Sequence, residues 1–390
     1  MTTRKSALLV RWELYDAENT AFESYNLKSS FTTPVDSFSF SLLEEQLPMT
    51  RPELEPVELF IHGASQGFGR IDKTDIGSAG SLMSLTGRDY LSNMTECKVD
   101  PTLKLSAGDT VFEAVTKAAG PVGIDTIHSD DDTPLRSIRT GQTIPSVPQL
   151  DVRNATLKDY KTSPGESIFQ YCNRIVARQG ATIQPGPNRS TLILAAPNYD
   201  QEPLYFATRR RDKASAANTI KTGSASRDFS HFPTHALVKG KNSSKGSATP
   251  MSMSIDFEIF ANSSVSELAE IFKDKCDGDR RKPGTTGDHG LLYRLMYKLD
   301  SEARNFAQLE RTALREIASR MKATLQYSCT LPGHATEGDT PYAVDTIIQI
   351  EDELAGVHEP MWIESREFTY SKAAGRETKL VCWRPGSFQI

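Results

Sequence analysis

Two stretches of the sequence match each other without a gap: SAGDTVFE at residues 106–113 and SPGESIFQ at residues 163–170. Serine, glycine and phenylalanine occupy the same positions in both, and an acid stands fourth in each. A base follows at the same distance, Lys117 in the first copy and Arg174 in the second. Because an internal repeat reveals architecture before any residue chemistry does, these stretches predict two copies of one small structural unit.

Each copy is predicted to contain a short capped helix. In the second copy, Ser163 and Glu166 have the spacing of a capping box, and Pro164 suits the first helical position. Gly120 and Gly180 can adopt the left-handed conformation that ends a helix. Helical spacing places apolar residues on one face of each copy: Val111, Phe112, Val115, Ala118 and Ala119 in the first, and Ile168, Phe169, Cys172, Ile175 and Val176 in the second.

A strand is predicted after each helix, at residues 124–127 and 182–194. Any two capped amphipathic helices resemble each other to some degree, so chance is one explanation of the match. The β pattern after both helices favours a repeated helix-plus-strand unit. We therefore expect residues 101–200 to hold two small α/β units.

The first hundred residues have the pattern of β structure. Apolar and polar residues alternate around residues 8–14, 37–42, 57–61 and 82–86. Period-two alternation is typical of half-buried strands, which close into a barrel or stack as a sandwich. The apolar positions that we expect to face the core are Leu8, Val10, Trp12, Leu14, Phe38, Phe40, Leu42, Val57, Leu59, Ile61, Met83 and Leu85.

The second half of the chain returns to β structure around a helical segment. Strands are predicted at 203–208, 235–239, 344–350, 361–370 and 379–383, with Gly375 in the last turn. Residues 240–250 have the composition of a loop, and a short helix is expected near residues 263–272. The longest predicted helix covers 303–325, with an apolar stripe that includes Phe306, Leu309, Leu314 and Ile317. Helices segregated from strands in this way indicate an α+β fold.

The net charge, the length of the apolar runs and the cysteine spacing argue against several classes of function. A net charge of −5 gives no basic footprint for nucleic acid, and no apolar run approaches the ~20 residues of a membrane span. Five scattered cysteines without a CxxC spacing argue against zinc and indicate reduced, buried thiols. The apolar part of the N-terminus is too short for a secretory signal.

The stretch GASQGFG at residues 63–69 resembles the nucleotide-binding turn of short-chain dehydrogenases. That turn requires a helix directly after it, and residues 70–80 have turn and strand character instead. The Tyr-x-x-x-Lys pair of that family is also absent from the sequence. We therefore interpret the glycines as part of a hairpin turn between Ile61 and Ile71.

Other catalytic and metal motifs are weak. His231 and His235 have the spacing of a helical ligand pair, but Pro233 lies between them in a strand-like region. The acidic run at residues 130–132 is typical of a solvated loop. No Gly-x-Ser-x-Gly motif is present, and no glycosidase-type acid pair is evident. We expect no catalytic residue, no cofactor and no metal site.

The ordered set of motifs resembles the baseplate hub proteins of contractile phage tails, especially the Mu-type hub, and more distantly the N-terminal half of VgrG spike proteins. Four segments carry the resemblance: GRID at 69–72 followed by LMSLTGRD at 82–89, the two repeat copies at 105–123 and 163–180, the helix at 303–324, and the tail PMWIESREFTYS at 360–371 with GRETKL at 375–380. The departures lie at residues 240–250 and 276–288.

The resemblance implies two tail-tube-like antiparallel β-barrels plus two small α/β units and a helical insertion. The corresponding boundaries are 1–100 for the first barrel, 101–200 for the α/β units, 201–255 with 326–390 for the second barrel, and 256–325 for the insertion. It also implies a non-enzymatic homotrimer that joins a sixfold tail tube to a threefold central spike.

The expected partners are the spike trimer, tail tube or tube-initiator proteins, and baseplate wedge proteins. DNA passes through without specific binding, and no membrane insertion is expected. The expected location is the virion tail baseplate, assembled in the bacterial host cytoplasm.

Two further hypotheses concern sites. Arg209, Arg210 and Arg211 form a basic cluster that is either a solvated loop or an interface contact. The helix at 303–325 is expected to pack on its own barrel rather than on a partner. As an alternative function, the chain is a cell-wall-degrading or glycan-binding tail module, which requires an acidic pair in a cleft.

Overall fold

The computed structural model describes residues 8–49, 52–77, 82–129 without 104 and 107, 295–300, and 306–387 without 337. It also describes 162–254, with gaps at 178, 187, 200, 213–214, 229, 231–234 and 242–247. The chain divides into two compact units. One comprises Met1–Gly223 with Ser328–Cys382, and the other comprises Ser224–Tyr327 with Trp383–Ile390.

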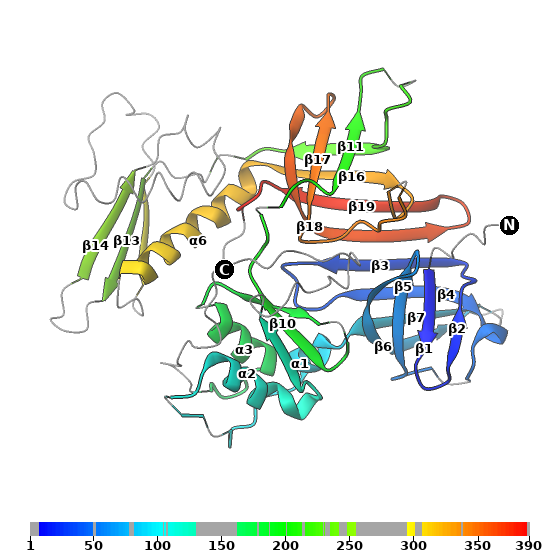
Figure 1. Ribbon diagram of the computed structural model, residues 1–390, viewed down its shortest axis with the longest axis horizontal. Helices are drawn as coiled ribbons and strands as arrows, with labels where there is room; N and C mark the ends of the chain where they lie inside the picture. Colours follow the sequence, from blue (N-terminus) through cyan, green and yellow to red (C-terminus); the bar gives the residue numbers. More distant parts are fainter. Residues whose placement is uncertain are drawn as a thin grey trace. The chain divides into compact units, whose positions relative to one another are not determined.

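The first β block consists of antiparallel strands in the spatial order β3-β4-β7-β6-β5-β1-β2 (Figure 1). The predicted core positions are buried, from Leu8, Val10 and Trp12 to Met83 and Leu85, with the exception of Leu14. Leu14 lies in the turn after β1 and is 68% exposed. The strands are β1 (Leu8–Trp12), β2 (Ala17–Asn19), β3 (Ser24–Ser30), β4 (Ser37–Leu43), β5 (Pro56–Ile61), β6 (Ala64–Ile76) and β7 (Leu82–Asp89).

The glycine-rich stretch forms a hairpin, and a long strand follows it. His62 and Gly63 make a two-residue turn, both with positive φ, as the tightest hairpin turns require. Gly67 and Gly69 lie within β6 itself. The hairpin interpretation is therefore confirmed, although the turn occupies two residues only.

The second β block continues the same sheet. The first part of β18 pairs with β17, and its later part, Ser365–Ser371, pairs with β3 of the first block. The strands of this block are β11 (Tyr205–Arg209), β12 (Thr222–Ser226), β16 (Gln326–Pro332), β17 (Ile347–Asp352), β18 (Val357–Ser371) and β19 (Gly375–Trp383).

This pairing changes the expected architecture. A mostly antiparallel α+β fold is confirmed, but the two blocks share one 13-stranded sheet. No closed barrel forms among the described strands. The reason is the length of β18: with 15 residues, it extends beyond its partner β17 and reaches β3.

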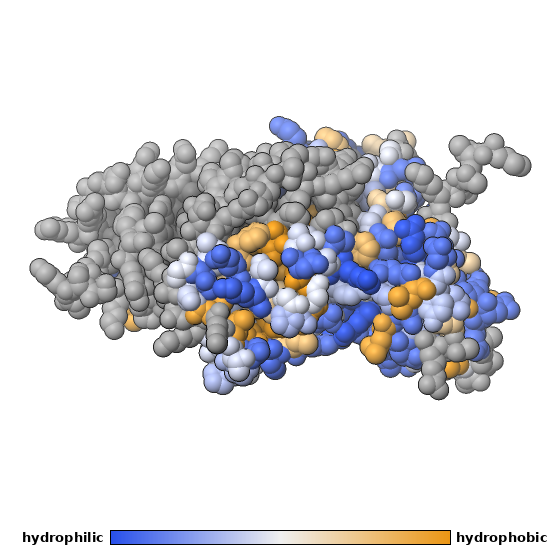
Figure 2. Space-filling view, turned by 60° about the horizontal axis from the view of Figure 1, so that its bottom comes forward, coloured by the Kyte–Doolittle hydropathy of each residue, from blue (hydrophilic) through white to orange (hydrophobic). Residues whose placement is uncertain are grey.

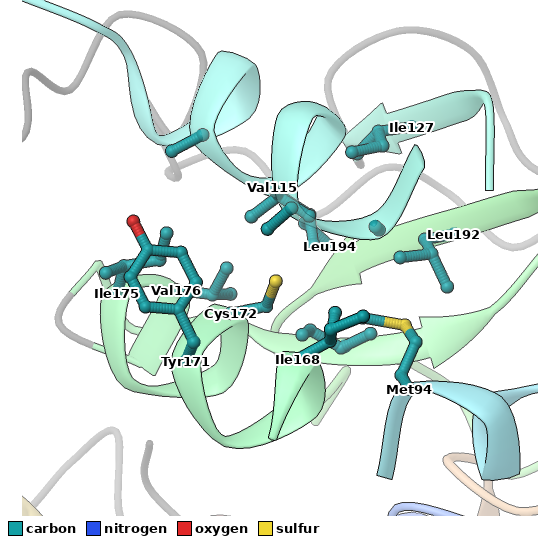
Figure 3. Packing of buried hydrophobic residues seen from close by; sticks show 14 of the residues in the cluster. Met94, Val115, Ile127, Ile168, Tyr171, Cys172, Ile175, Val176, Leu192 and Leu194 are labelled. Atoms are coloured by element: carbon teal, nitrogen blue, oxygen red, sulfur yellow. The ribbon is translucent and has the colours of Figure 1, made fainter. Parts of the chain in front are cut away.

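The two α/β units share one core (Figure 3). Strand β10 lies between β8 and β9, parallel to the first and antiparallel to the second. Tyr171, Cys172 and Val176 from α3 pack with Val115 from α2 and Leu194 from β10. The elements are α1 (Leu91–Glu96), α2 (Val111–Ala119), β8 (Thr126–Ser129), α3 (Ile168–Ala177), β9 (Thr182–Pro185) and β10 (Thr191–Ala195).

The two copies match in their helix caps, but the capping box of the second copy lies four residues later than we expected. Helix α3 begins at Ile168, where Ser167 Oγ accepts from the Gln170 N–H at 3.1 Å and Gln170 Oε1 accepts from the Ser167 N–H. Thr110 and Glu113 form the same box at α2. Ser163 and Glu166 form a turn before the helix instead.

The ends of the two helices match as well. The N–H of Gly123 donates to the Gly120 carbonyl, and that of Gly180 donates to the Ala177 carbonyl, both at 3.0 Å. Gly123 and Gly180 have φ of 86° and 81°. Gly120 is right-handed, which corrects its expected role, because a short 3-10 turn (Gly120–Val122) precedes the left-handed residue.

The second unit pairs a small sheet with the longest helix. The sheet has the order β14-β13-β15, and α6 (Phe306–Thr324) buries Ala313, Ile317 and Met321. Strand β13 (His235–Lys241) pairs with β14 (Ala248–Ser254) on one side and with β15 (Leu295–Asp300) on the other. From the sequence we expected residues 235–254 in the second β block instead. The short helix expected near 263–272 and the acidic run at 130–132 lie outside the described residues.

Candidate assembly sites

Arg209 is a structural residue of the second β block. Its guanidinium makes two hydrogen bonds to the Asp352 carboxylate, at 2.8 and 2.7 Å, and donates a third to the Gly223 carbonyl. The Asp352 side chain is fully buried at the end of β17, and its Oδ1 also accepts from the N–H groups of Leu354 and Ala355. Because both charges are paired out of water, Arg209 fixes β11 to the β17–β18 turn.

The other two arginines of the cluster, Arg210 and Arg211, both contact Glu353. Arg210 pairs with Glu353 at 2.9 Å, and the Arg211 N–H donates to the same carboxylate. These contacts hold the pKa of Glu353 below its usual range, first through the Arg211 N–H and then through Arg210. Arg211 is exposed, and the Arg210 side chain is 43% exposed, so both lie at the surface.

The Gly-Arg-Asp motif at residues 87–89 organises one face of the first β block. Gly87 lies opposite Ile71, and a Cβ there would collide with the Arg70 carbonyl and the Phe38 ring. Asp89 accepts from the N–H of Asp36 and from that of Leu91, which begins α1. The glycine therefore makes room for a core aromatic ring, and the aspartate connects two neighbouring segments to β7.

Arg70 and Arg88 face each other across β6 and β7 and share their acidic partners. Asp72 and Glu96 each pair with both arginines, and Arg70 also donates to Asn93 at 2.6 Å. Burial alone would raise the pKa of Asp72, but the two arginines outweigh it and lower the pKa. The network joins the sheet to α1.

Buried polar groups cluster where the two β blocks meet. The Tyr25 hydroxyl lies 2.8 Å from His334 Nε2, and Glu364 accepts from the hydroxyls of Ser30 and Thr32. Arg366 is 2% exposed and donates to Gln66 Oε1 at 2.7 Å. Each contact joins a residue numbered below 70 to one numbered above 330, so the polar network ties the blocks to each other.

The sequence contains a signal for this join in the alternation of β18. Glu364 and Arg366 are in phase with the buried residues Trp362 and Phe368 along β18. Charged residues on the buried face of a strand require partners inside the protein. Their spacing therefore marks an internal polar contact, although it does not identify Gln66 or Ser30 as the partners.

A small cavity lies beside this join. Its volume is about 40 Å³, and its lining includes Ser29, Phe38, Gln66, Asp89 and Arg366. That volume is enough for a water molecule but too small for a sugar ring.

Other candidate sites find no support in the described residues. No three His, Cys, Asp or Glu side chains of the described chain are placed to hold a metal ion. His231 is outside the described residues, and His235 lies in β13, a strand in which no helical ligand pair can form. No described helix has the length and apolarity that a membrane crossing requires.

Solved structures share this fold over nearly the whole chain. A tail protein from Neisseria meningitidis MC58 is 19% identical with a TM-score of 0.68, and the match covers 98% of this chain and 97% of that one. The 43 kDa tail protein of prophage MuSo2 from Shewanella oneidensis is 13% identical, with a TM-score of 0.68 and coverages of 98% and 99%. The chain therefore shares the overall fold of these tail proteins, although the two closed barrels that the resemblance implied do not form among the described strands.

The more distant resemblance to VgrG also appears in the fold. A Francisella PdpA–VgrG complex matches with 8% identity and a TM-score of 0.50, over 97% of this chain and 57% of that one. No family model and no curated protein matches the sequence.

Proposed function

We propose that the chain is the structural hub of a contractile tail or related injection machine. In this proposal three copies form a ring in the tail baseplate that joins a sixfold tail tube to a threefold spike. The ring also forms part of the conduit for DNA or effectors, and the protein has no catalytic role.

The observation that carries the proposal is the fold match with two tail proteins over essentially their full lengths. A match over a single domain would be compatible with many functions, because common folds serve many roles. Here the β blocks, the α/β repeat and the smaller unit are all included in one alignment.

The division of unit 1 into two β blocks supports the proposed symmetry. Three subunits with two comparable blocks each present six β segments around a ring, which is the number that a sixfold tube requires. The described sheet is open, and its outer strands have unpaired edges in one subunit. Pairing of edges between neighbouring subunits completes such sheets and removes an aggregation hazard.

The polar contacts at the join also suit a mechanical role. Buried, hydrogen-bonded networks specify one arrangement of the segments that they connect. A ring that transmits force between tube and spike needs its two blocks held in one arrangement. The alternative, a cell-wall-degrading module, requires an acidic pair in a cleft, and the clearing of a peptidoglycan suspension by the purified chain would favour it.

Mass photometry of the purified full chain tests the proposal. For the chain alone we expect a species near three times the chain mass of 43.1 kDa; once the spike protein of the same particle is added, we expect a complex whose mass is that of three chains plus one spike trimer. A chain that remains monomeric in both samples contradicts the proposed hub.

A further inference from the structure

One face of the large sheet carries short polar side chains in a continuous grid. Strands β18, β3, β4, β7 and β6 lie side by side in that order (Figure 1), and their registers align three rows of residues across them. At the usual spacings of a sheet the grid measures about 19 Å by about 14 Å, which is a surface rather than a pocket. We call this grid the hydroxyl face. Its rows are Ser371, Ser24, Ser41, Ser84 and Asp75; Thr369, Asn26, Ser39, Thr86 and Lys73; and Glu367, Lys28, Ser37, Arg88 and Arg70.

The other side of these strands forms the core, so the hydroxyl face is the side that the subunit leaves to solvent. Leu27, Phe38 and Phe368 alternate with residues of the grid and are buried, whereas no residue of the grid is buried. An antiparallel sheet commonly leaves one face to solvent, and such faces usually mix charged side chains of both signs. Here the first four positions of the first two rows hold only serine, threonine and asparagine. A plain solvated face does not require such a run of short, uncharged side chains.

The charged residues at the border of the hydroxyl face balance one another. Lys73 pairs with Asp75 at 2.7 Å, and the two arginines of the third row share the carboxylates of Asp72 and Glu96. The bases of the face are Lys28, Arg70, Lys73 and Arg88, and the acids on it or paired with it are Asp72, Asp75, Glu96 and Glu367. The face therefore has no net charge at neutral pH.

This composition argues against two common uses of a broad polar surface. The rows contain no aromatic or apolar residue, and serine is depleted in protein–protein contacts, whose centres are apolar. In Figure 2, separate hydrophobic residues stand among hydrophilic ones over the first β block, at the right of the view. A surface that grips nucleic acid needs an excess of positive charge and aromatic rings for stacking, and the hydroxyl face has neither.

We propose that the hydroxyl face lines the conduit of the proposed ring, where it lets duplex DNA pass without holding it. Short side chains narrow a passage least, and their hydroxyl groups hydrogen-bond the water between wall and cargo. A wall without net charge neither repels a polyanion nor retains it. The inference rests on the proposed function, because the conduit exists only in the ring.

Cysteine reactivity in the assembled hub–spike complex tests the location of the face. Ser39→Cys is made in a Cys97→Ser, Cys276→Ser background, because Cys97 is exposed whereas the other described cysteines are buried. The complex is treated with N-ethylmaleimide and with a maleimide on a long polyethylene glycol chain. Ser106→Cys, at an exposed position of the α/β repeat, is the matched control. We expect the ratio of the long-reagent rate to the small-reagent rate to be at least tenfold lower for Ser39→Cys than for Ser106→Cys.

The other outcomes of this experiment contradict the inference in distinguishable ways. Equal ratios in a complex that contains three chains place the face outside the conduit and leave the hub proposal intact. A Ser39→Cys thiol that neither reagent modifies is buried against another subunit or protein, which also leaves the hub proposal intact. A chain that forms no ring of three contradicts both the hub proposal and the inference.

Added charge tests how the face treats DNA. Thr86→Lys with Thr369→Lys places two positive charges per chain on the hydroxyl face, and a ring of three gathers them around one channel. We expect this complex to bind duplex DNA at least tenfold more tightly than the wild type, with a steeper dependence on salt. Ser106→Lys with Phe206→Lys adds the same charge at exposed positions elsewhere. Equal DNA binding by the two double variants, or tight binding by the wild type, contradicts the proposed wall.

Discussion

Tyr25 and His334 meet across the join between the two β blocks, with the tyrosine hydroxyl 2.8 Å from His334 Nε2. The other ring nitrogen, Nδ1, lies 3.3 Å from the Thr378 hydroxyl, which itself donates to the Gly333 carbonyl. Because Thr378 has used its proton, we infer that Nδ1–H donates to it and that Tyr25 donates to Nε2. His334 therefore holds the blocks together as a neutral ring.

This arrangement predicts that stability falls with acid. Burial, reinforced by Arg376, His62 and Arg366, lowers the pKa of His334 from 6.5 to about 3. The unfolded chain then binds the extra proton between these values, so the free energy of unfolding decreases as the pH falls through this window, by up to about 1.4 kcal/mol per pH unit. In urea unfolding, the gap between wild type and His334→Gln should narrow from pH 7 to pH 4. Parallel pH profiles would show that His334 does not titrate in this way.

Breaking the buried pair of Arg209 and Asp352 should be costly. Asp352→Asn leaves the guanidinium without its charge partner and should lower the free energy of unfolding by about 3–5 kcal/mol. The double variant Arg209→Met with Asp352→Leu should recover most of that loss. Arg211→Ala, whose side chain is exposed, should stay within about 0.5 kcal/mol of wild type. If Asp352→Asn unfolds at the wild-type urea concentration, the pair contributes no stability.

The glycine of the Gly-Arg-Asp motif should tolerate no side chain. Gly87→Ala places a methyl group against the Arg70 carbonyl and the Phe38 ring. Phe38→Ala should not rescue this variant, because the backbone carbonyl remains in the way. Gly120→Ala is the control: its φ is −51° and its Cβ position is open, so we expect a neutral or slightly stabilising effect. Thermal unfolding by circular dichroism provides the comparison, and a Gly87→Ala variant as stable as Gly120→Ala would refute the packing described here.

The two repeat copies offer an internal comparison of ion pairs. Arg174 contacts Glu166 through two nitrogens, whereas Lys117 contacts Asp109 through one, and the arginine pair is less exposed. Double-mutant cycles should give a coupling of up to about 1 kcal/mol for Arg174–Glu166 and a smaller, more salt-sensitive one for Lys117–Asp109. Equal couplings in the two copies would argue that geometry and exposure do not control these pairs.

Local patterns explain which parts of the fold could be predicted. The repeat at residues 106 and 163 was found because a helix, its cap and the following strand are encoded within about 20 residues. Even there, the capping box expected at Ser163 and Glu166 was placed too early, because the helix begins after Ser167, which forms the box with Gln170. Alternation located the core face of β1 but could not show that Leu14 lies past its end.

Long-range pairing explains what was missed. The contact between β3 and β18 joins residues separated by more than 300 positions, and nothing local specifies it. The same holds for Arg209, whose partner Asp352 is 143 residues away, so a run of three arginines resembled a surface cluster.

The most direct test of the account is a cryo-electron microscopy reconstruction of the hub bound to its spike, viewed along the ring axis. We predict a ring of three chains in which the six β blocks lie about 60° apart around the channel. A ring of six chains, or three chains with only one β block each facing the channel, would contradict the proposal that two blocks in one subunit reconcile threefold and sixfold symmetry.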